Sequence, residues 1–179
     1  NGQLWEGVQI RIRGESSRGY PKKSFKVNFS GEYRFFDRDK LNLISEFTDP
    51  TLSREFLAYD LYHRAGLYAS HAWFTRLVVN GEYLGLYLDI ENVDKYYLDG
   101  TDLDNNSSIY KADLNGTILS PEEDVEELWV KQTNLGTGFY DLNNLIEWLD
   151  LVSDKDFFDE LKDRFDPNDL ARTVAVNSL

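Results

Sequence analysis

The stretch WFTRLVVNGEYLGLYLDIE, residues 73–91, predicts a β-hairpin in the centre of the fold. Asn80 and Gly81 are the pair favoured at the two corners of a type I′ turn, because both corners need a positive φ. Apolar and β-branched residues on either side of the turn are typical of strands. We expect the second strand to run to about Ile90 and to leave the sheet through residues 91–93.

The same turn fixes the register of the hairpin. With two residues in the turn, Leu77 opposes Leu84 and Val78 opposes Tyr83. Both faces of the hairpin are then largely apolar, as expected for strands that are covered on both sides. The hairpin is therefore predicted to be a central element of its sheet.

Upstream of the hairpin, the sequence predicts one helix. Gly66 stands where a glycine after the last helical turn is expected, and Thr51 or Ser53 is expected to cap the first turn. The apolar stripe at helical spacing consists of Leu57, Ala58, Leu61, Tyr62 and Ala65.

Further upstream, the pattern predicts a strand, a loop and a second strand. Apolar residues alternate with polar ones over residues 8–12 and again over 25–29. The loop between these strands contains Gly14, Gly19 and Pro21. Lys26 alternates with the apolar residues of its strand, so it should project from the opposite face.

Downstream of the hairpin, the chain changes from strands to helices. SIYKADL (108–114) suits a short strand after a polar loop, and apolar residues then recur at helical spacing from Phe139 to Phe165. Asp166 and Pro167 are suited to start a last helix. We predict an α+β fold. Its first part covers residues 1–135, and residues 136–179 are the start of a helical second part.

Composition limits the function. The chain has 32 Asp and Glu against 19 Lys and Arg, a net charge of −13, which disfavours nucleic acids and anionic membranes as partners. It has no cysteine for disulfides or thiolate chemistry, and no run of about 18 apolar residues that would span a membrane. It starts at Asn1 and has no methionine, so we expect a piece of a longer precursor.

Positive charge is concentrated in RIRGESSRGYPKKSFKV, residues 11–27. A P-loop is excluded, because its second glycine is followed by Lys and Ser or Thr and then by a helix. A Gly- and Ser-rich loop between two strands instead matches the hairpin with which protein kinases cover nucleotide phosphates. The alternative is a solvated basic hairpin whose charges protect a sheet edge from pairing.

In the same region the chain resembles a known family. RGESSRGYPKKSFKVNF (13–29) is very similar to a signature of the spore-coat protein H (CotH) kinase family. The similarity covers nearly the whole chain in the same order, through DPTLSREFLAYDLYHRAGL (49–67), LVVNGEYLGLYLDIENVDKYYL (77–98), IYKADL (109–114) and DLNNLIEWLD (141–150).

The resemblance implies an atypical protein-kinase-like fold that phosphorylates protein serines with ATP and Mg or Mn. It makes the sheet-rich part a nucleotide-binding lobe and the C-terminal helices the start of a truncated second lobe. It places the adenine at the segment DIENV (89–93), through backbone groups near Glu91 and Val93. The residues it assigns to the ATP phosphates are Arg13, Gly14, Ser16, Ser17, Arg18 and either Lys23 or Lys26.

Lys26 is the favoured phosphate lysine, because a strand holds it better than a loop would. Glu15 departs from the signature, which often has Asn there, and adds a negative charge to the loop. Kinases pair their lysine with a helix glutamate, and Glu55 and Asp60 are the carboxylates available on the predicted helix. The His-Arg pair at 63–64 is not a catalytic loop, because Ala65 occupies the place of the acid.

In the family, the catalytic-base Asp and the metal-binding Asp follow the segment matching DLARTVAVNSL (169–179). We therefore assign no catalytic or metal-binding residue to this chain and expect residues 1–179 alone to be inactive. Members occur in bacterial spore coats and in secreted or cellulosome-associated proteins. An extracellular or spore-coat location follows from the resemblance, with cellulosomal or spore-coat proteins as possible partners.

Other patterns point less clearly to function. Asp102, Asp104 and Asn106 approach the spacing of a calcium loop, but the required glycine and closing glutamate are absent, so a turn-rich loop is predicted. The two histidines lack the spacing of a zinc helix. The four tryptophans are dispersed over core-patterned elements, so we predict core positions rather than a sugar-stacking surface.

The sequence leaves two functions open. The first is the ATP-binding portion of a CotH-like serine kinase. The second is a non-catalytic module of a spore coat or cellulosome-associated protein that works by contact.

Overall fold

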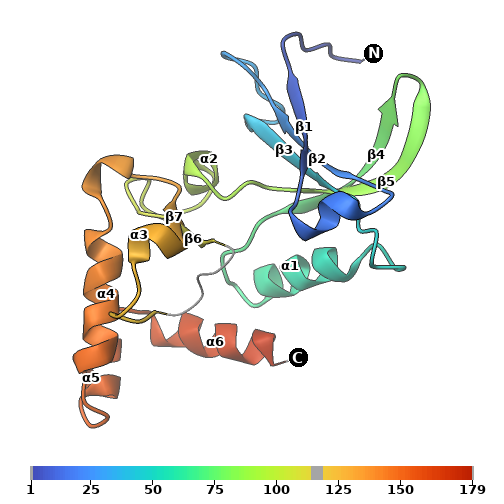
Figure 1. The fold of residues 1–179 in the computed structure, drawn as a ribbon. Coiled ribbons are helices and arrows are strands. Elements are labelled where there is room, and N and C mark those ends of the chain that lie inside the picture. The colour runs from blue at the N-terminus through green and yellow to red at the C-terminus, as the bar shows by residue number, and fades with distance from the viewer. Residues whose placement is uncertain (1, 114–118, 179) are drawn as a thin grey trace. The chain divides into compact units, whose positions relative to one another are not determined.

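The computed structural model describes residues 2–113 and 119–178, apart from the side chain of Ser16, and shows an α+β fold (Figure 1). The described residues form two compact units. The first unit extends to Asn92 and includes residues 175–178, and the second runs from Val93 to Val174. The functional boundary expected between residues 135 and 136 stays a prediction.

The first unit is built on a five-stranded antiparallel sheet in the order β1-β2-β3-β5-β4. A short 3₁₀ helix, η1, lies in the loop after β1, and the helix α1 lies between β3 and β4 (Figure 1). The elements are β1 (Gln9–Arg13), η1 (Ser16–Gly19), β2 (Ser24–Asn28), β3 (Lys40–Ile44), α1 (Arg54–Arg64), β4 (Ala72–Val79) and β5 (Glu82–Ile90).

The predicted hairpin is confirmed as β4 and β5, although its register was predicted only in part. Asn80 and Gly81 have φ values of 52° and 85°, as the turn requires. Val78 pairs with Tyr83, but the next pair joins Leu77 to Gly85, because a bulge shifts the register there. β5 lies inside the sheet, whereas β4 forms its edge.

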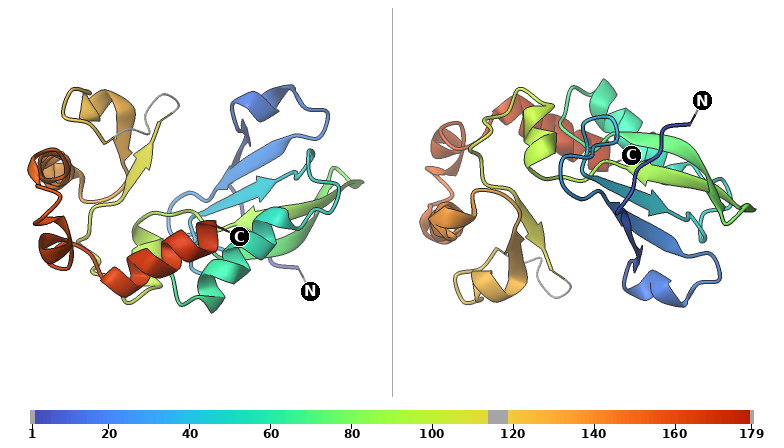
Figure 2. Two further views of the ribbon diagram at one scale, coloured as in Figure 1. Left: turned by 90° about the horizontal axis from the view of Figure 1, so that it is seen from below. Right: turned by 90° about the horizontal axis from the view of Figure 1, so that it is seen from above.

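Alternation along the strands divides the sheet into two faces. One face carries the apolar cluster of the first unit, centred on Val27, Leu43 and Tyr87. The other face, which we call the cationic face, carries Arg11, Lys26 and Asn42, which lie side by side on β1, β2 and β3, and Arg13, two residues along β1 from Arg11. Figure 2 shows α1 lying along one side of the sheet.

Helix α1 lies where the sequence predicts it, but the predicted apolar stripe is not the side that faces the sheet. The stripe residues Leu57 and Leu61 are exposed, with 57% and 36% of their surface accessible. The less exposed side is formed by Glu55, Phe56 and Tyr59, and the Phe56 ring lies 4.9 Å from that of Phe74 on β4. The helix therefore turns a partly polar side toward the sheet.

The two ends of α1 differ in how well they were predicted. Gly66 has φ +74°, and its N–H and that of Leu67 donate to His63 and Tyr62, which forms a Schellman motif. The Ser53 side chain makes no capping hydrogen bond. The buried Asp49 carboxylate instead accepts from the backbone N–H groups of Thr51, Ser53 and Arg54 at 2.9–3.0 Å.

The second unit is mostly helical and has its own core. Its buried centre consists of Val125, Leu142 and Ile146. The Asp166 carboxylate accepts from the N–H of Asn168 at 2.8 Å, as predicted for the start of the last helix. The elements are α2 (Lys95–Asp99), β6 (Tyr110–Ala112), α3 (Val125–Leu128), β7 (Trp129–Lys131), η2 (Leu135–Thr137), α4 (Tyr140–Leu151), α5 (Phe157–Leu161) and α6 (Pro167–Asn177).

Charge is divided unequally along the chain. Residues 1–92 have 12 Lys and Arg against 12 Asp and Glu, whereas residues 93–179 have 7 against 20. The whole negative excess therefore lies after the first unit's sheet. Within the described part of the chain, none of the helices has the length and apolar character needed to cross a membrane.

Candidate functional site

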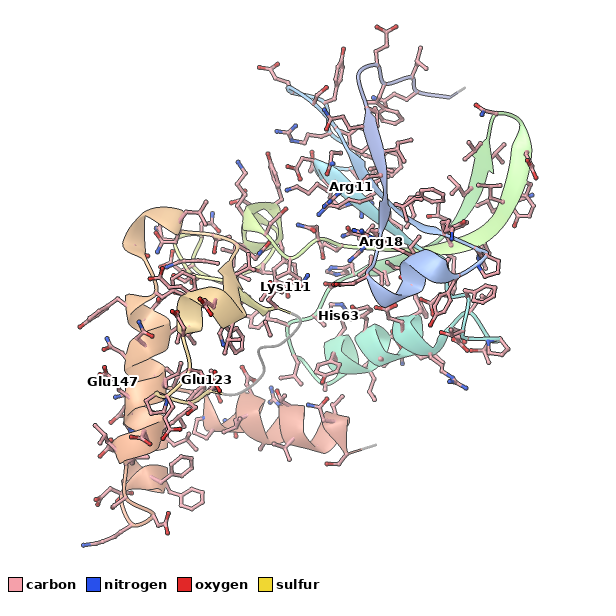
Figure 3. All side chains as sticks on the ribbon, viewed as in Figure 1. Arg11, Arg18, His63, Lys111, Glu123 and Glu147 are labelled. Atoms are coloured by element: carbon pink, nitrogen blue, oxygen red, sulfur yellow. The ribbon has the colours of Figure 1, made fainter. Side chains whose placement is uncertain are left out.

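The candidate site begins with three cationic side chains on neighbouring strands. Arg11 of β1 pairs with Lys26 of β2, which in turn pairs with Asn42 of β3. Arg13 lies two residues further along β1 and therefore on the same face. Figure 3 shows Arg11 on β1 and Arg18 in the loop that follows this strand. The sheet thus presents a row of positive charge beside this loop.

At the β3 end of the row lies a buried amide whose oxygen has no partner among the described atoms. Lys26 Nζ donates to Asn92 Oδ1 at 3.2 Å, and Asn42 Nδ2 donates to the Ile90 carbonyl at 3.0 Å. Asn42 is 3% exposed, and its Oδ1 has no hydrogen-bond partner among the described atoms. Because an unpaired buried acceptor is costly, this atom is suited to a donor from a ligand or from water.

The loop between β1 and β2, which lies beside this row, is held by hydrogen bonds from its own Arg18 and Lys23. Gly14 has φ +89°, and a Cβ at this position would lie 2.0 Å from Ser17 Oγ, so the turn requires glycine. Arg18 Nε donates to the Gly14 carbonyl at 2.7 Å, and Lys23 Nζ donates to the Arg18 carbonyl at 2.6 Å. Lys23 is thereby used within the loop, and the Ser16 side chain lies outside the described part.

Arg13 faces the helix glutamate. Burial lowers the pKa of the Arg13 guanidinium, and the charges of Glu55 and Tyr59 oppose this shift. The Tyr59 hydroxyl donates to Glu55 Oε1 at 3.3 Å, and burial together with Glu55 raises the pKa of Tyr59 to about 12. The helix carboxylate therefore lies near an arginine of β1.

A second carboxylate, Glu46, adjoins Glu55. Burial, a hydrogen bond with Glu55 and repulsion from Glu55 and Asp49 raise the pKa of Glu46 to about 7. Lys22 opposes the shift, and its own pKa is lowered by burial. Lys22 Nζ donates to the carbonyl oxygens of Ser45 at 2.7 Å and Leu86 at 2.5 Å, so it ties the loop to β3 and β5.

The remaining predicted residues lie apart from the row. Asp60 pairs with Arg64 at 2.6 Å on the exposed side of α1. The Glu91 N–H donates to the His71 carbonyl at 2.8 Å, and the Glu91 carboxylate accepts from His71 Nδ1 at 2.9 Å. Any adenine contact at this segment must therefore use backbone groups other than the Glu91 N–H. Val93 begins the second unit.

The described residues contain no group of three or more His, Asp or Glu side chains arranged to hold a metal ion. In the polar loop, Asp104 Oδ1 accepts from the Asn106 N–H at 2.9 Å, which is a local turn bond.

Sequence reasoning missed Arg11, Asn42 and Glu46. Arg11 could have been found, because it alternates with Ile10 and Ile12 in the same way as Arg13. Asn42 requires knowledge of the strand register, and Glu46 requires knowledge of which side of α1 turns inward. The Asn42 contact with Ile90 joins residues that are distant in sequence, and the Glu46 contact with Glu55 joins a loop to α1.

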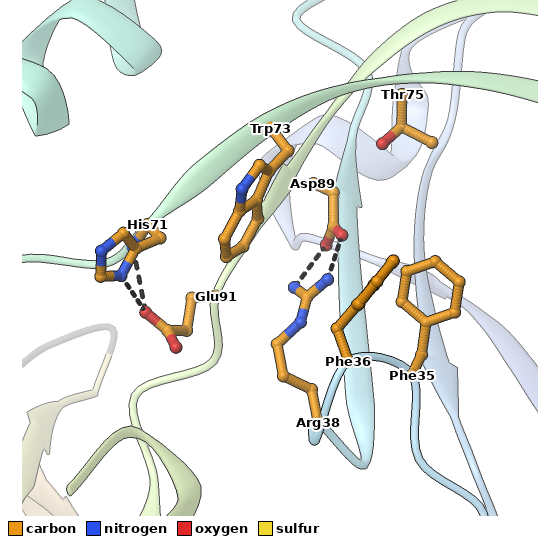
Figure 4. Close-up of a pocket in the computed structure, with 8 residues that line it drawn as sticks. All are labelled: Phe35, Phe36, Arg38, His71, Trp73, Thr75, Asp89 and Glu91. Atoms are coloured by element: carbon orange, nitrogen blue, oxygen red, sulfur yellow. Dashed lines mark hydrogen bonds and ion pairs between the residues drawn. The ribbon is translucent and has the colours of Figure 1, made fainter. Parts of the chain in front are cut away.

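A further cavity lies elsewhere, against the opposite face of the sheet. It has a volume of about 560 Å³ and is lined by aromatic side chains together with Arg38 and Asp89 (Figure 4). Trp73 lines it and is 43% exposed, so the prediction that this tryptophan belongs to the core is wrong.

Comparison with known proteins identifies the family. The model of the family described as CotH kinase protein matches residues 10–179. This chain belongs to the CotH kinase protein family. Inner spore coat protein H of Bacillus subtilis (strain 168) is 27% identical over 175 residues, which are 94% of this chain and 48% of that protein. The chain thus spans about half the length of this curated relative.

Proposed function

We propose that this chain is the ATP-binding portion of a CotH-like protein serine kinase. The phosphates would lie against the cationic face, under the loop from Arg13 to Arg18. The observation that supports this most strongly is the group of cations formed by Arg11, Arg13 and Lys26, next to a loop that requires glycine. Cations and close backbone approach are what a polyphosphate needs.

Lys26 is the phosphate lysine in this proposal, and Lys23 is not. Lys26 extends from the middle of a strand, and its neighbour in the sheet is a neutral amide. Lys23 is half-buried and donates within the loop. The order of three strands, a helix and two strands, with a helix glutamate facing the sheet, supports a kinase-like arrangement.

The site departs from the common kinase pattern in two respects. The candidate lysine lies on the second strand rather than the third, where Asn42 stands. The helix glutamate lies near Arg13, which approaches it from the first strand. We propose that Arg13 and Glu55 form the pair that holds the helix against the nucleotide-binding sheet.

The direct test is ATP binding measured by calorimetry with MgCl₂ present. Lys26→Met should weaken ATP binding about tenfold or more, because a charged hydrogen bond to phosphate is lost. Lys162→Met, a matched change at an exposed lysine of the second unit, should bind ATP as the unchanged chain does. Unaltered binding in Lys26→Met, or no binding by the unchanged chain, would refute the assignment.

Phosphoryl transfer is proposed for the longer protein, since we assign the catalytic and metal carboxylates to residues outside this chain. ATP supplies the phosphoryl group, and the residues described here bind and orient its phosphates. Transfer to protein serines, followed with radiolabelled ATP in the longer protein, should fall strongly in Lys26→Met. Transfer that is unaffected by this change would contradict the proposed role.

The second candidate is a module that works by contact in a spore coat or another extracellular assembly. It is favoured by the name of the relative, inner spore coat protein H. Absence of ATP-dependent thermal stabilisation, together with retained assembly into the coat in Lys26→Met, would support this function instead.

A further inference from the structure

The cavity on the face opposite the cationic row has the composition of a binding site. Figure 4 shows Arg38 reaching between Trp73 and Phe36, with its two terminal nitrogens on Asp89. Phe35 and Phe36 come from the turn between β2 and β3, and Trp73 comes from β4. Its volume of about 560 Å³ lies within the roughly 300–1,000 Å³ that is usual for small-molecule sites.

The turn that supplies two of these rings is strained. Phe36 and Asp37 have φ values of 48° and 62°, and Phe35 and Arg38 bond to each other across them at 2.9 and 3.2 Å. The other turn of this kind in the sheet uses Asn80 and Gly81, which tolerate positive φ. A bulky residue in this conformation is unusual, and such strain concentrates at ligand-binding positions.

The strain does not serve the packing of the core. Phe36 is 83% exposed, and its ring lies edge-on to Phe35 at 4.8 Å. The turn thus holds a large apolar surface in water beside a cavity, at a position where glycine or asparagine would be relaxed. Binding of a ligand against this ring is the use that accounts for both features.

The two carboxylates that line the cavity, Asp89 and Glu91, each have a hydrogen-bond donor. Arg38 is bound by both oxygens of Asp89 at 2.7 and 3.2 Å, and its guanidinium lies 4.5 Å from the centre of the Trp73 ring. Glu91 accepts from His71 Nδ1. An anionic ligand would find Arg38 already matched by Asp89 and would lie near the Glu91 carboxylate, so the lining disfavours anions.

Fixed donors and acceptors nevertheless remain at the cavity. Arg38 has five N–H donors, of which the bidentate pair uses two. His71 Nδ1 bonds to Glu91, and Nε2 is a second ring nitrogen that donates or accepts according to the tautomer. Thr75 adds a hydroxyl that both donates and accepts.

We propose that this cavity binds a neutral sugar ring of a glycan. A sugar ring has an apolar C–H face, which packs against aromatic rings, and a rim of hydroxyl groups that both donate and accept. Phe36 supplies the open aromatic surface, while Arg38 and His71 supply directional polar groups. This site is separate from the proposed ATP site, because the two lie on opposite faces of the sheet.

The test is a titration of the 179-residue chain with neutral disaccharides, followed by the NMR signal of the Trp73 indole N–H. The probes are maltose, cellobiose, lactose and N,N′-diacetylchitobiose. We expect at least one to shift this signal saturably, with a dissociation constant of about 0.1–10 mM. No shift with any of the four at tens of millimolar would overturn the proposal.

Phe36→Gly gives a second measurement that does not depend on lost folding. Removal of the ring should weaken sugar binding at least about tenfold, while relief of the positive φ raises the unfolding midpoint by about 2–4 °C. Tyr33→Ala, which removes an exposed ring outside the cavity, should leave sugar binding unchanged. Undiminished binding in Phe36→Gly, or tighter binding of glucose 6-phosphate than of glucose, would contradict a neutral-sugar site.

Discussion

The two faces of the five-stranded sheet use polar side chains in opposite ways. On the cationic face, Lys26 donates to a neutral amide, and a buried amide oxygen beside it has no partner among the described atoms. On the other face, Arg38 and Asp89 satisfy each other at 2.7 Å with little exposure to water. The matched pair stabilises the fold, whereas the Asn42 oxygen on the cationic face can still accept a hydrogen bond from a ligand or water.

The largest effect is expected when the Arg38–Asp89 pair loses one of its two partners. Asp89→Leu should destabilise the chain by about 3–5 kcal/mol, because it leaves the Arg38 guanidinium buried without its carboxylate. Urea unfolding at neutral pH measures this loss. The double change with Arg38→Met should recover much of it, and a double variant as unstable as the single one would show that the pair is not the cause.

The loop on the cationic face gives the next effect. Gly14→Ala should cost about 1–2 kcal/mol and weaken ATP binding, because alanine is strained at φ +89° and its Cβ would displace the Ser17 hydroxyl. Gly19→Ala is the matched control, since a Cβ there has no heavy atom within 4 Å. Equal losses in both variants would mean that the loop has no specific need for glycine at its start.

A smaller effect comes from Glu46 and depends on pH. Its folded-state pKa of about 7 lies above the ordinary 4.5, so the folded chain holds this proton more tightly and loses stability as pH rises between the two values. Glu46→Gln should gain about 1–2 kcal/mol at about pH 8, after allowance for solvent screening, and almost nothing at about pH 4. A gain of the same size at both pH values would exclude ionisation of Glu46 as its origin.

The smallest effect is expected on the outer side of α1. Arg64→Ala removes the ion pair with Asp60, whose partners are both solvent-accessible, and should change stability by less than about 0.5 kcal/mol. Glu55→Gln on the inner side should instead alter ATP binding. If the outer change proved the more harmful for ATP binding, the orientation assigned to α1 would be wrong.

Local patterns predicted the elements of this fold well. The Asn80-Gly81 turn, the glycine after α1 and the Asp166 cap all depend on residues close in sequence, and the structure confirms each. The predicted register of the hairpin is wrong from Leu77 on, where Gly85 at φ +115° permits a bulge. The apolar pattern of the strands gives no sign of this bulge.

The side of α1 that faces inward could not be predicted in this way. Apolar residues of α1 were expected to face the sheet. This side of the sheet carries Arg13, and the carboxylate of Glu55 on α1 interacts favourably with its charge. The choice therefore depends on a partner 42 positions away in the sequence. Asn42 and Arg38 were missed for the same reason, since their importance comes from neighbours on other strands.

The unequal distribution of charge between the two units has a consequence for solubility. Residues 1–92 balance 12 cations against 12 anions and, near neutral pH, provide no net repulsion between copies of the protein. Residues 93–179 contribute the whole excess of acidic side chains and thereby the colloidal stability of the chain. Neutralising substitutions among these acidic residues should promote precipitation even though they leave the sheet and its two faces untouched.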